Sequence, residues 1–216
     1  MSTQAALLMG SLDKKVYTNV TVTNVGRQEV VIAQVGVTHS KCAKVKFAFM
    51  KSIGIFYGSS SGNTETVAKQ IQKGLGADAQ VFEVSKAKKE DLEKFDNLIL
   101  GTSTWGFGDL QDDFEGFMSQ IEAANLSGKT VALFGCGDQE SYSDTFVNGM
   151  GQVWQALQNK GCKIVGQTST DGYSFSASDA VVDDKFVGLA IDENNQSDMT
   201  DERIAAWVET LKSSLS

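Results

Sequence analysis

The chain has 216 residues, which is long enough for one α/β domain with its own core, and a formal net charge of −8. The charge is divided unevenly, because residues 1–50 hold six Lys or Arg against two acidic residues, whereas residues 51–216 hold 13 against 25. An acidic body disfavours nucleic acid and anionic membranes as partners and favours basic proteins. The three cysteines form no Cys-x-x-Cys pair, and His39 is the single histidine. This composition argues against a disulfide framework, His-based catalysis and a metal site.

Residues 1–50 differ in composition from the rest of the chain. They are poor in acidic residues and rich in Ser, Thr, Val and Ala, which predicts an organelle transit peptide. Two alternatives stay open. Residues 16–22 alternate Val with Thr and Asn and would suit a short extra β element, or the natural start would be Met50. No stretch approaches the roughly 20 apolar residues of a membrane span.

After residue 50, short apolar runs alternate with longer segments of helical periodicity. The predicted strands span residues 52–57, 80–83, 97–102, 130–135 and 162–166. The predicted helices span residues 64–75, 112–123, 146–160 and 201–213. Strands that alternate with helices predict a parallel sheet covered on both faces. We therefore expect an α/β domain over residues 51–216, a three-layer, doubly wound fold with a five-stranded parallel sheet.

The loop between the first predicted strand and helix is rich in hydroxyl groups. It contains Ser59, Ser60, Ser61, Gly62, Asn63 and Thr64. Amide N–H groups at a helix N-terminus bind anions, and hydroxyl groups add further neutral donors. The loop lacks the Lys-Ser/Thr ending of a nucleoside-triphosphate loop and the Gly-x-Gly-x-x-Gly order of a dinucleotide fold. It predicts a phosphate site, because a simple N-capped turn would explain only one of the hydroxyl residues.

Two further loops leave the third and fourth predicted strands. The first contains Ser103, Thr104, Trp105, Gly106, Phe107 and Gly108, and the second contains Cys136, Gly137, Asp138, Tyr142 and Asp144. Ligands of doubly wound sheets bind beyond the carboxyl ends of the strands, so the three loops are expected to converge. Trp105 and Tyr142 beside a phosphate loop predict a planar ring that carries a phosphate and is held by stacking.

Taken together, these motifs resemble the flavodoxin family over about residues 51–216. The resemblance rests on residues 59–64, on Thr104-Trp105, and on Gly137-Asp138-Gln139 with Tyr142. Residues 168–186 are similar to the insertion of long-chain flavodoxins, which interrupts the last strand. The resemblance implies non-covalently bound flavin mononucleotide (FMN), with Trp105 on the inner ring face and Tyr142 on the outer one. Asp138 and neighbouring backbone amides would meet the polar pyrimidine edge.

The resemblance also implies a low-potential one-electron carrier rather than an enzyme, because the redox chemistry belongs to the cofactor. Acidic side chains beside the loops would oppose added negative charge on the flavin. They are Asp109, Asp112, Asp113, Asp138 and Asp144. The Gly106-Phe107 peptide would turn its carbonyl toward the flavin when one electron arrives.

The implied partners are basic redox proteins, namely ferredoxin-NADP reductase and, in a photosynthetic source, photosystem I. We expect a monomer without nucleic acid or membrane insertion, in the chloroplast stroma if residues 1–50 are a transit peptide and in the cytoplasm otherwise. Two alternatives are an FMN-dependent NAD(P)H:quinone reductase, for which the sequence offers neither a nicotinamide site nor a dimer interface, and a receiver module. A receiver module needs clustered acidic residues at the end of the first strand, where this chain has Gly58 and Ser59. The insertion is expected to serve either partner docking or stabilisation.

Overall fold

The computed structural model describes residues 20–24, 30–35, 52–76 and 78–215. The chain divides into two compact units, Met1–Phe49 and Met50–Ser216. In the first unit, strands β1 (Val20–Asn24) and β2 (Val30–Val35) pair in antiparallel fashion. The β element that residues 16–22 would form, as one alternative to a transit peptide, lies mostly outside the described residues, and so does His39.

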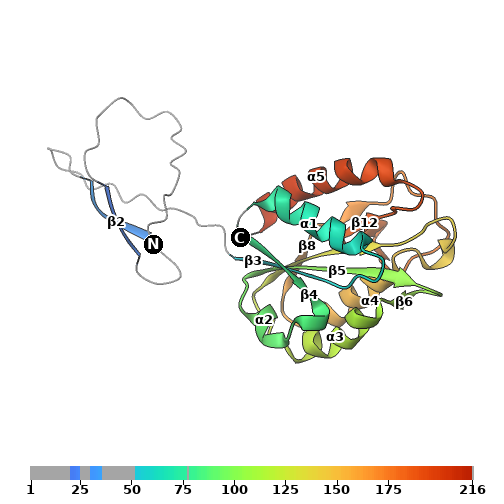
Figure 1. Cartoon of the computed structure of the whole chain (residues 1–216), viewed down its shortest axis with the longest axis horizontal. Helices are drawn as coiled ribbons and strands as arrows, with labels where there is room; N and C mark the ends of the chain where they lie inside the picture. The colour runs from blue at the N-terminus through green and yellow to red at the C-terminus, as the bar shows by residue number, and fades with distance from the viewer. Residues whose placement is uncertain (1–19, 25–29, 36–51, 77, 216) are drawn as a thin grey trace. The chain divides into compact units, whose positions relative to one another are not determined.

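The second unit is a parallel sheet between two layers of helices (Figure 1). Its central strands lie in the order β12-β7-β5-β3-β4. These strands are β3 (Ile53–Tyr57), β4 (Ala79–Glu83), β5 (Asn97–Trp105), β7 (Thr130–Cys136) and β12 (Leu189–Ile191). The helices are α1 (Asn63–Leu75), α2 (Lys89–Glu93), α3 (Asp112–Ala123), α4 (Asn148–Leu157) and α5 (Ser197–Ser214), with short 3₁₀ turns η1 (Val84–Lys86) and η2 (Ser143–Thr145). This arrangement confirms the predicted doubly wound α/β fold.

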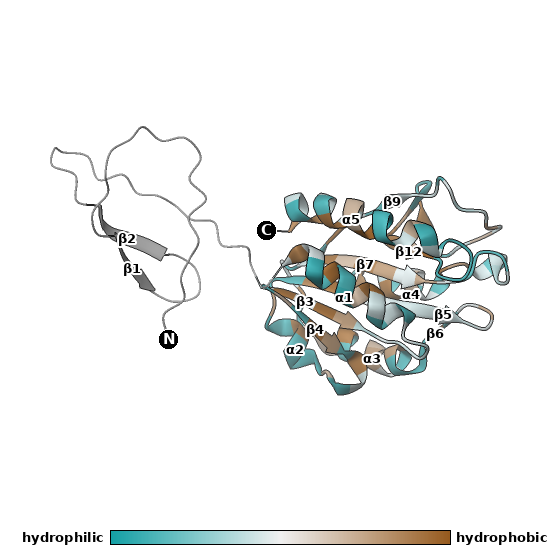
Figure 2. Cartoon of the chain, turned by 45° about the horizontal axis from the view of Figure 1, so that its top comes forward, coloured by the Kyte–Doolittle hydropathy of each residue, from teal (hydrophilic) through white to brown (hydrophobic). Residues whose placement is uncertain are grey.

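Successive residues of each central strand face opposite helical layers. In β3, Phe56 packs into the core that α3 and α4 cover, whereas Ile55 and Tyr57 pack into the core that α1 and α5 cover. In β5, Leu98 and Ile99 divide between the two cores in the same way. The apolar colour of Figure 2 accordingly runs along the sheet, and hydrophilic colour lies on the outer faces of the helices. Burial on both faces explains why these strands are continuous apolar runs.

Two short strands share the fifth place in the sheet. β8 (Lys163–Val165) pairs with the first half of β7, and β12 pairs with the second half. The residues between them form a small antiparallel sheet of β9 (Thr168–Ser169), β10 (Val181–Val182) and β11 (Lys185–Phe186). The insertion at residues 168–186 therefore interrupts the last strand, as predicted.

Several helix ends differ from the prediction. α4 begins at Asn148 rather than at residue 146, because Val147 adopts a left-handed backbone (φ 51°) at the N-cap. α5 begins at Ser197, four residues before the predicted start at residue 201. The prediction missed this first turn because it is polar and has no apolar periodicity. α2 was not predicted, since five residues are too few to show a helical period. Within the described residues, no helix has both the length and the apolar character that crossing a bilayer requires.

Candidate functional site

The carboxyl ends of four parallel strands meet at one edge of the sheet, here called the rim. Tyr57 of β3 lies opposite Gly101 of β5, and Ser103 of β5 lies opposite Cys136 of β7. Cys136 in turn lies opposite Ile191 of β12. The loops that leave these strands therefore lie side by side, as the sequence predicts for a doubly wound sheet.

The loop of residues 58–64, here called the phosphate loop, turns from β3 into α1 through a left-handed glycine. Gly62 has φ 92°, and no atom lies within 4 Å of the position that a Cβ would take. Its N–H donates to Ser59 Oγ at 3.1 Å, and Thr66 Oγ1 donates to its carbonyl at 2.9 Å. No side chain caps α1, so the amides of its first turn remain for an anion. Ser60, Ser61 and Asn63 are exposed around this turn.

Thr64 is the buried member of the phosphate loop. It is 1% exposed, and its Oγ1 has no hydrogen-bond partner among the described residues. The thiol of Cys136 lies nearby, but a thiol is too weak a partner to replace a full hydrogen bond. A buried hydroxyl left unsatisfied costs about 1–3 kcal/mol. A ligand that bonds to Thr64 Oγ1 would remove this cost.

Cys136 lies beneath the phosphate loop at the end of β7. Burial raises the pKa of its thiol to about 12, and the Thr64 hydroxyl opposes this shift only in part. The thiol is therefore neutral and acts as a small apolar side chain rather than as a nucleophile. The side chain of this predicted site residue is buried, and its backbone lies between β5 and β12.

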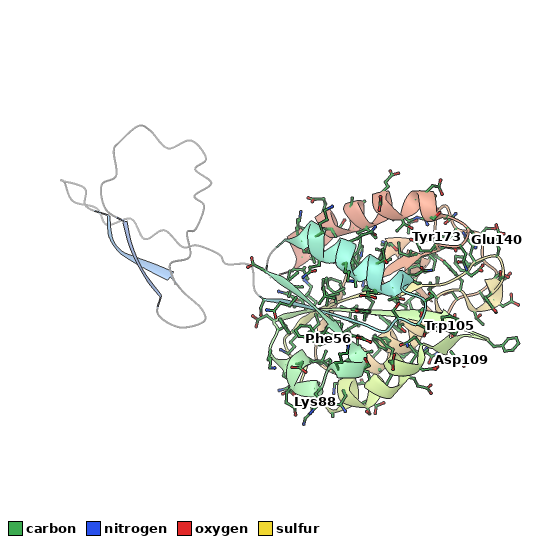
Figure 3. All side chains as sticks on the ribbon, viewed as in Figure 1. Phe56, Lys88, Trp105, Asp109, Glu140 and Tyr173 are labelled. Atoms are coloured by element: carbon green, nitrogen blue, oxygen red, sulfur yellow. The ribbon has the colours of Figure 1, made fainter. Side chains whose placement is uncertain are left out.

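The second loop is a β-hairpin of residues 103–111, here called the Trp105 hairpin. β5 extends beyond the sheet to Trp105 and pairs there with β6 (Asp109–Leu110), so that Trp105 lies opposite Asp109. Figure 3 shows Trp105 and Asp109 at the same end of the unit as Glu140 of the neighbouring loop, and Phe56 within the sheet. Trp105 is 46% exposed, and its Nε1 donates to Ser103 Oγ at 2.9 Å. The indole face is thus held in place while much of its surface stays open.

Helix α4 supports the Trp105 hairpin at two points, one in β5 and one in the turn. Gly149 N donates to Thr104 Oγ1 at 3.0 Å, and Gln152 Nε2 donates to Gly108 O at 2.7 Å. Between these two bonds, the side chain of Phe107 is 94% exposed. Only the backbone of Phe107 therefore belongs to the candidate site, and its side chain points away from the protein.

The third loop, residues 137–147, is here called the Tyr142 loop. Tyr142 is 48% exposed, and its N–H donates to Asp138 O at 3.1 Å. The Asp138 carboxylate accepts four hydrogen bonds, from the backbone N–H groups of Glu140 and Ser141 and from the side-chain amides of Asn194 and Asn195. This carboxylate is fully used inside the protein, which leaves the loop backbone to meet the polar edge of a ligand.

The charge of Asp138 is stable in this setting. Burial by itself raises the pKa of the Asp138 carboxyl, but hydrogen bonds from Ser141, Asn194 and Asn195 outweigh burial and hold the pKa well below its usual range. The ionised carboxylate ties the Tyr142 loop to the loop that follows β12.

The insertion supports the Tyr142 loop from the other side. Ser174 N donates to Gln139 Oε1 at 2.6 Å, and Ser178 Oγ donates to Phe146 O at 2.5 Å. Beneath these bonds, the ring of Phe146 packs against three aromatic rings of the insertion, those of Tyr173, Phe175 and Phe186. The insertion therefore contributes both hydrogen bonds and ring packing to the Tyr142 loop.

Sequence reasoning missed the residues that join the loops. Gln111 is 2% exposed; its Oε1 accepts from Phe114 N at 3.0 Å, and its Nε2 donates to Ser60 Oγ at 3.2 Å. It therefore caps α3 and links the Trp105 hairpin to the phosphate loop. Gly58 leaves room for it, because a Cβ there would collide with Gln111 Oε1. The position of Gln111 directly before the acidic first turn of α3 is the signal that could have identified it as a helix cap.

The structure thus brings the predicted site residues together at the rim, although their contacts with a ligand stay predictions. Asp144 lies in η2 and is exposed, like Asp109, Asp112 and Asp113. Over residues 52–76 and 78–215, no group of His, Cys, Asp and Glu side chains could hold a metal ion. The rim therefore offers neutral hydrogen-bond donors for a phosphate, two half-exposed aromatic rings and surrounding carboxylates.

Comparison with known proteins decides which family has this combination. The Flavodoxin family model matches residues 55–207. The chain belongs to the flavodoxin family. It is 50% identical over 165 residues to a flavodoxin of Helicobacter pylori, covering 76% of this chain and 99% of that one. It is 47% identical over 164 residues to a flavodoxin of Nostoc sp. strain PCC 7120, covering 76% and 96%.

A solved flavodoxin structure shows the same arrangement. The flavodoxin of Fusobacterium nucleatum bound to flavin mononucleotide superposes with a TM-score of 0.74 at 35% identity, over 77% of this chain and 100% of that one. These comparisons confirm the resemblance that the three loops indicated.

Proposed function

We propose that this flavodoxin carries single electrons on non-covalently bound FMN. The observation that carries the proposal is the convergence at one rim of a neutral phosphate loop, with the unsatisfied buried hydroxyl of Thr64, and the half-exposed rings of Trp105 and Tyr142. Bound FMN would supply the one-electron chemistry. As a flavodoxin, the chain is an electron-transfer protein rather than an enzyme, so the quinone reductase alternative is not retained.

Each loop has a distinct task in holding the cofactor. Residues 59–64 would bind the phosphate through hydroxyl groups, backbone amides and the positive end of α1. Trp105 and Tyr142 would stack on the ring system and exclude water from it. The backbone at Gly137 and Asp138 would bond to the polar edge of the ring, because the Asp138 carboxylate is already occupied.

A matched pair of variants tests the phosphate loop. Thr64→Val removes the unsatisfied buried hydroxyl, whereas Thr66→Val removes an exposed hydroxyl that bonds to Gly62 O in the same turn. Thr64→Val should weaken FMN binding by about tenfold, the size of one lost hydrogen bond, and Thr66→Val much less. Riboflavin, which lacks the phosphate, should bind both variants as it binds the unmodified protein. Equal loss of FMN and riboflavin affinity in Thr64→Val would contradict a phosphate role.

The absorption spectrum of the purified protein tests the cofactor itself. Flavin bands should be present, acid precipitation should release the flavin intact, and reduction should proceed in two separable one-electron steps. A protein without flavin bands after incubation with FMN would refute the proposal.

The carboxylates around the rim support a low potential and a basic partner. Asp109, Asp112, Asp113 and Asp144 are exposed there, and each would oppose negative charge added to the cofactor. The same charges would attract a basic docking surface, such as that of ferredoxin-NADP reductase or, in a photosynthetic source, photosystem I. The electron-transfer rate between the monomeric flavodoxin and the reductase should then fall as ionic strength rises. A rate independent of salt would contradict electrostatic docking.

Residues 1–50 precede the part of the chain that is matched to the flavodoxin family. Their composition, poor in acid and rich in Ser and Thr, supports a transit peptide that directs the protein to the chloroplast stroma. Mass spectrometry of the protein isolated from its source cells would find a first residue near position 50 if the segment is removed. A first residue near position 1 would contradict this proposal and favour the cytoplasm.

A further inference from the structure

Asp192 is a buried acidic residue that no step of the proposed function uses. It directly follows β12, the fourth strand that ends at the rim, and it is 0% exposed. Its side chain accepts hydrogen bonds from three residues, one of which belongs to the Tyr142 loop. A carboxyl group is costly to bury unless its oxygens are well bonded, so the groups that it bonds indicate its role.

The two oxygens of Asp192 bond to different parts of the molecule. Oδ1 accepts from the backbone N–H groups of Asn194 at 3.2 Å and Asn195 at 3.1 Å, which closes the turn that leads toward α5. Oδ2 accepts from Gln139 N at 3.1 Å, across 53 positions of the sequence. Oδ1 therefore serves its own loop, whereas Oδ2 holds the backbone of the Tyr142 loop.

A second link between the same two loops passes through the side chain of Asn195. Its Nδ2 donates to Asp138 Oδ1 at 2.9 Å and to Asp192 Oδ2 at 2.9 Å. Two ionised carboxyl groups are acceptors only and cannot bond to each other, so this amide is the donor that connects them. The Tyr142 loop is thus attached to the end of β12 at its backbone and at a side chain.

The Tyr142 loop uses nearly all of its first amide groups inside the protein. From residue 137 to residue 142, the backbone N–H groups that donate within the described chain are those of Gly137, Gln139, Glu140, Ser141 and Tyr142. Asp138 N has no acceptor among the described residues. The amides on either side of it are held at the end of β12, by Ile191 O and by Asp192 Oδ2. The Asp138 N–H is therefore the donor of this stretch that remains for a ligand.

We propose that Asp192 is a positioning residue for the cofactor, which holds the Tyr142 loop through Gln139 and Asn195 so that Asp138 N can donate to the polar edge of the flavin ring. The inference rests on the proposed function, and it adds a fourth rim loop, residues 192–196, to the three that would contact FMN. Asp192 acts through the Tyr142 loop, because its own oxygens are bonded within the protein. A loop that is held in place before binding loses less conformational freedom when the ligand binds, which raises affinity.

Asp192→Asn separates the link between the loops from the turn before α5. An asparagine keeps one oxygen, which can still accept from the amides of the turn, but its Nδ2 is a donor and cannot accept from Gln139 N. Glu193→Gln is the matched control. It removes a carboxyl group from the same loop, at a half-buried side chain that makes no hydrogen bond within the described chain.

Dissociation constants of FMN, riboflavin and lumiflavin, measured by quenching of flavin fluorescence, test the role of Asp192. Asp192→Asn should weaken the binding of all three by about tenfold, because the three share the ring and its polar edge. Thr64→Val should instead weaken FMN alone, and Glu193→Gln should bind all three as the unmodified protein does. Unchanged affinities in Asp192→Asn would overturn the inference, and so would a loss confined to FMN.

Infrared spectra of the bound flavin distinguish positioning from a general loss of stability. A weaker hydrogen bond from Asp138 N should move a carbonyl band of the flavin pyrimidine ring to higher frequency in Asp192→Asn and leave it in place in Glu193→Gln. Lower stability of the fold would not move the band in those molecules that still hold the flavin. A band that stays in place in Asp192→Asn would therefore overturn the inference, even if affinity fell.

Asn195→Ala tests the same link from an exposed position, which keeps the inference testable if Asp192→Asn does not fold. It removes the donor between Asp138 and Asp192, and it should shift the three affinities and the carbonyl band in the same direction, by less. Unchanged values in this variant would count against the link. An unmodified protein that binds no flavin would refute the proposed function itself, whereas normal binding in every variant would refute only the role of Asp192.

Discussion

Gln152 reaches from α4 to the Trp105 hairpin, and its side-chain amide is one of several that join segments far apart in the sequence. Gln139, which is 3% exposed, accepts a bond from the insertion, and Asn148, which is 8% exposed, does the same through Asp179 N. Gln111 connects two of the three loops. These amides, of which those of Gln111, Gln139 and Asn148 are buried, fix the relative positions of loops that would otherwise be independent, because a buried amide left without partners is costly.

We expect Gln152→Leu to loosen the Trp105 hairpin. The leucine fills a similar volume but leaves Gly108 O without its donor, so opening of the turn should become easier by about 1 kcal/mol. Amide hydrogen exchange of Gly108 and Gln111, measured by NMR on the FMN-free protein, should accelerate by about fivefold. Gln155→Leu, an exposed position of the same helix, is the control and should leave the exchange unchanged. Identical exchange in both variants would show that α4 does not restrain the hairpin.

Asp138 gives a prediction on pH. Its pKa is lower in the folded protein than in the unfolded chain, so the ionised form stabilises the fold. That stabilisation is complete above the unfolded value of about 4 and is lost as pH falls through the folded value. The stability difference between the unmodified protein and Asp138→Asn, from urea unfolding, should therefore be constant from pH 5 to 7 and shrink below about pH 4. A difference that grows on acidification would have the wrong sign.

The sequence could predict the aromatic and hydroxyl residues of the site but not the residues that hold them. Trp105 and Tyr142 stand out because a large ring in a polar loop has little to pack against locally. The supporting roles of Gln139 and Asn148 could not be predicted, although Gln139 belongs to the motif at residues 137–139, since their partners lie more than 30 positions away in the chain. Their role depends on which loops the fold brings together.

At the scale of elements, most of the strands and helices could be predicted from the periodicity of the apolar residues. The five strand places and four of the helices follow from runs and periods that burial on two faces requires. The start of α4 could not be predicted in this way, because Val147 before it adopts a left-handed backbone that is rare for a β-branched residue. The second half of the interrupted last strand, β12, was given no bounds in the prediction, since three residues have no period of their own.

The turn between β10 and β11 has a strained backbone that two substitutions should relieve. Its two-residue turn has left-handed backbone at Asp183 (φ 50°) and Asp184 (φ 60°), positions that favour Asn and Gly. We expect Asp183→Asn with Asp184→Gly to raise the free energy of unfolding by about 1 kcal/mol. Urea unfolding of the FMN-free protein measures the change. Asp183→Asn with Asp184→Ala removes the same charges but keeps a Cβ at position 184, so it should gain less; an equal gain would point to charge rather than backbone conformation.

At the scale of the whole molecule, acidic charge is placed where it can act on the cofactor and the partner together. α3 begins at the rim with Asp112 and Asp113 and ends at Ala123, about 18 Å away along a helix of this length. Its first turn therefore lies much closer to the candidate site than its last turn does. One helix thus provides both a test position and a control position for charge.

Neutralising the rim end of α3 should raise the reduction potential. For Asp112→Asn with Asp113→Asn we expect about 20–70 mV per charge, from Coulomb's law at roughly 10 Å and an effective dielectric of 20 to 80. Potentiometric titration of the FMN-loaded protein measures both steps. Glu122→Gln, at the far end of the same helix, should change the potential much less. Equal shifts from both ends would show that net charge, rather than position, sets the potential.

The split fifth strand has a practical consequence. β8 and β12 keep their pairing with β7 on either side of the insertion, so the register of the central sheet does not depend on how long the intervening chain is. The turn at Asp183 and Asp184 is exposed and lies outside that sheet. A peptide tag or a reporter domain could be inserted at this turn, because exposed loop tips tolerate added sequence and the three loops of the rim would keep their supports.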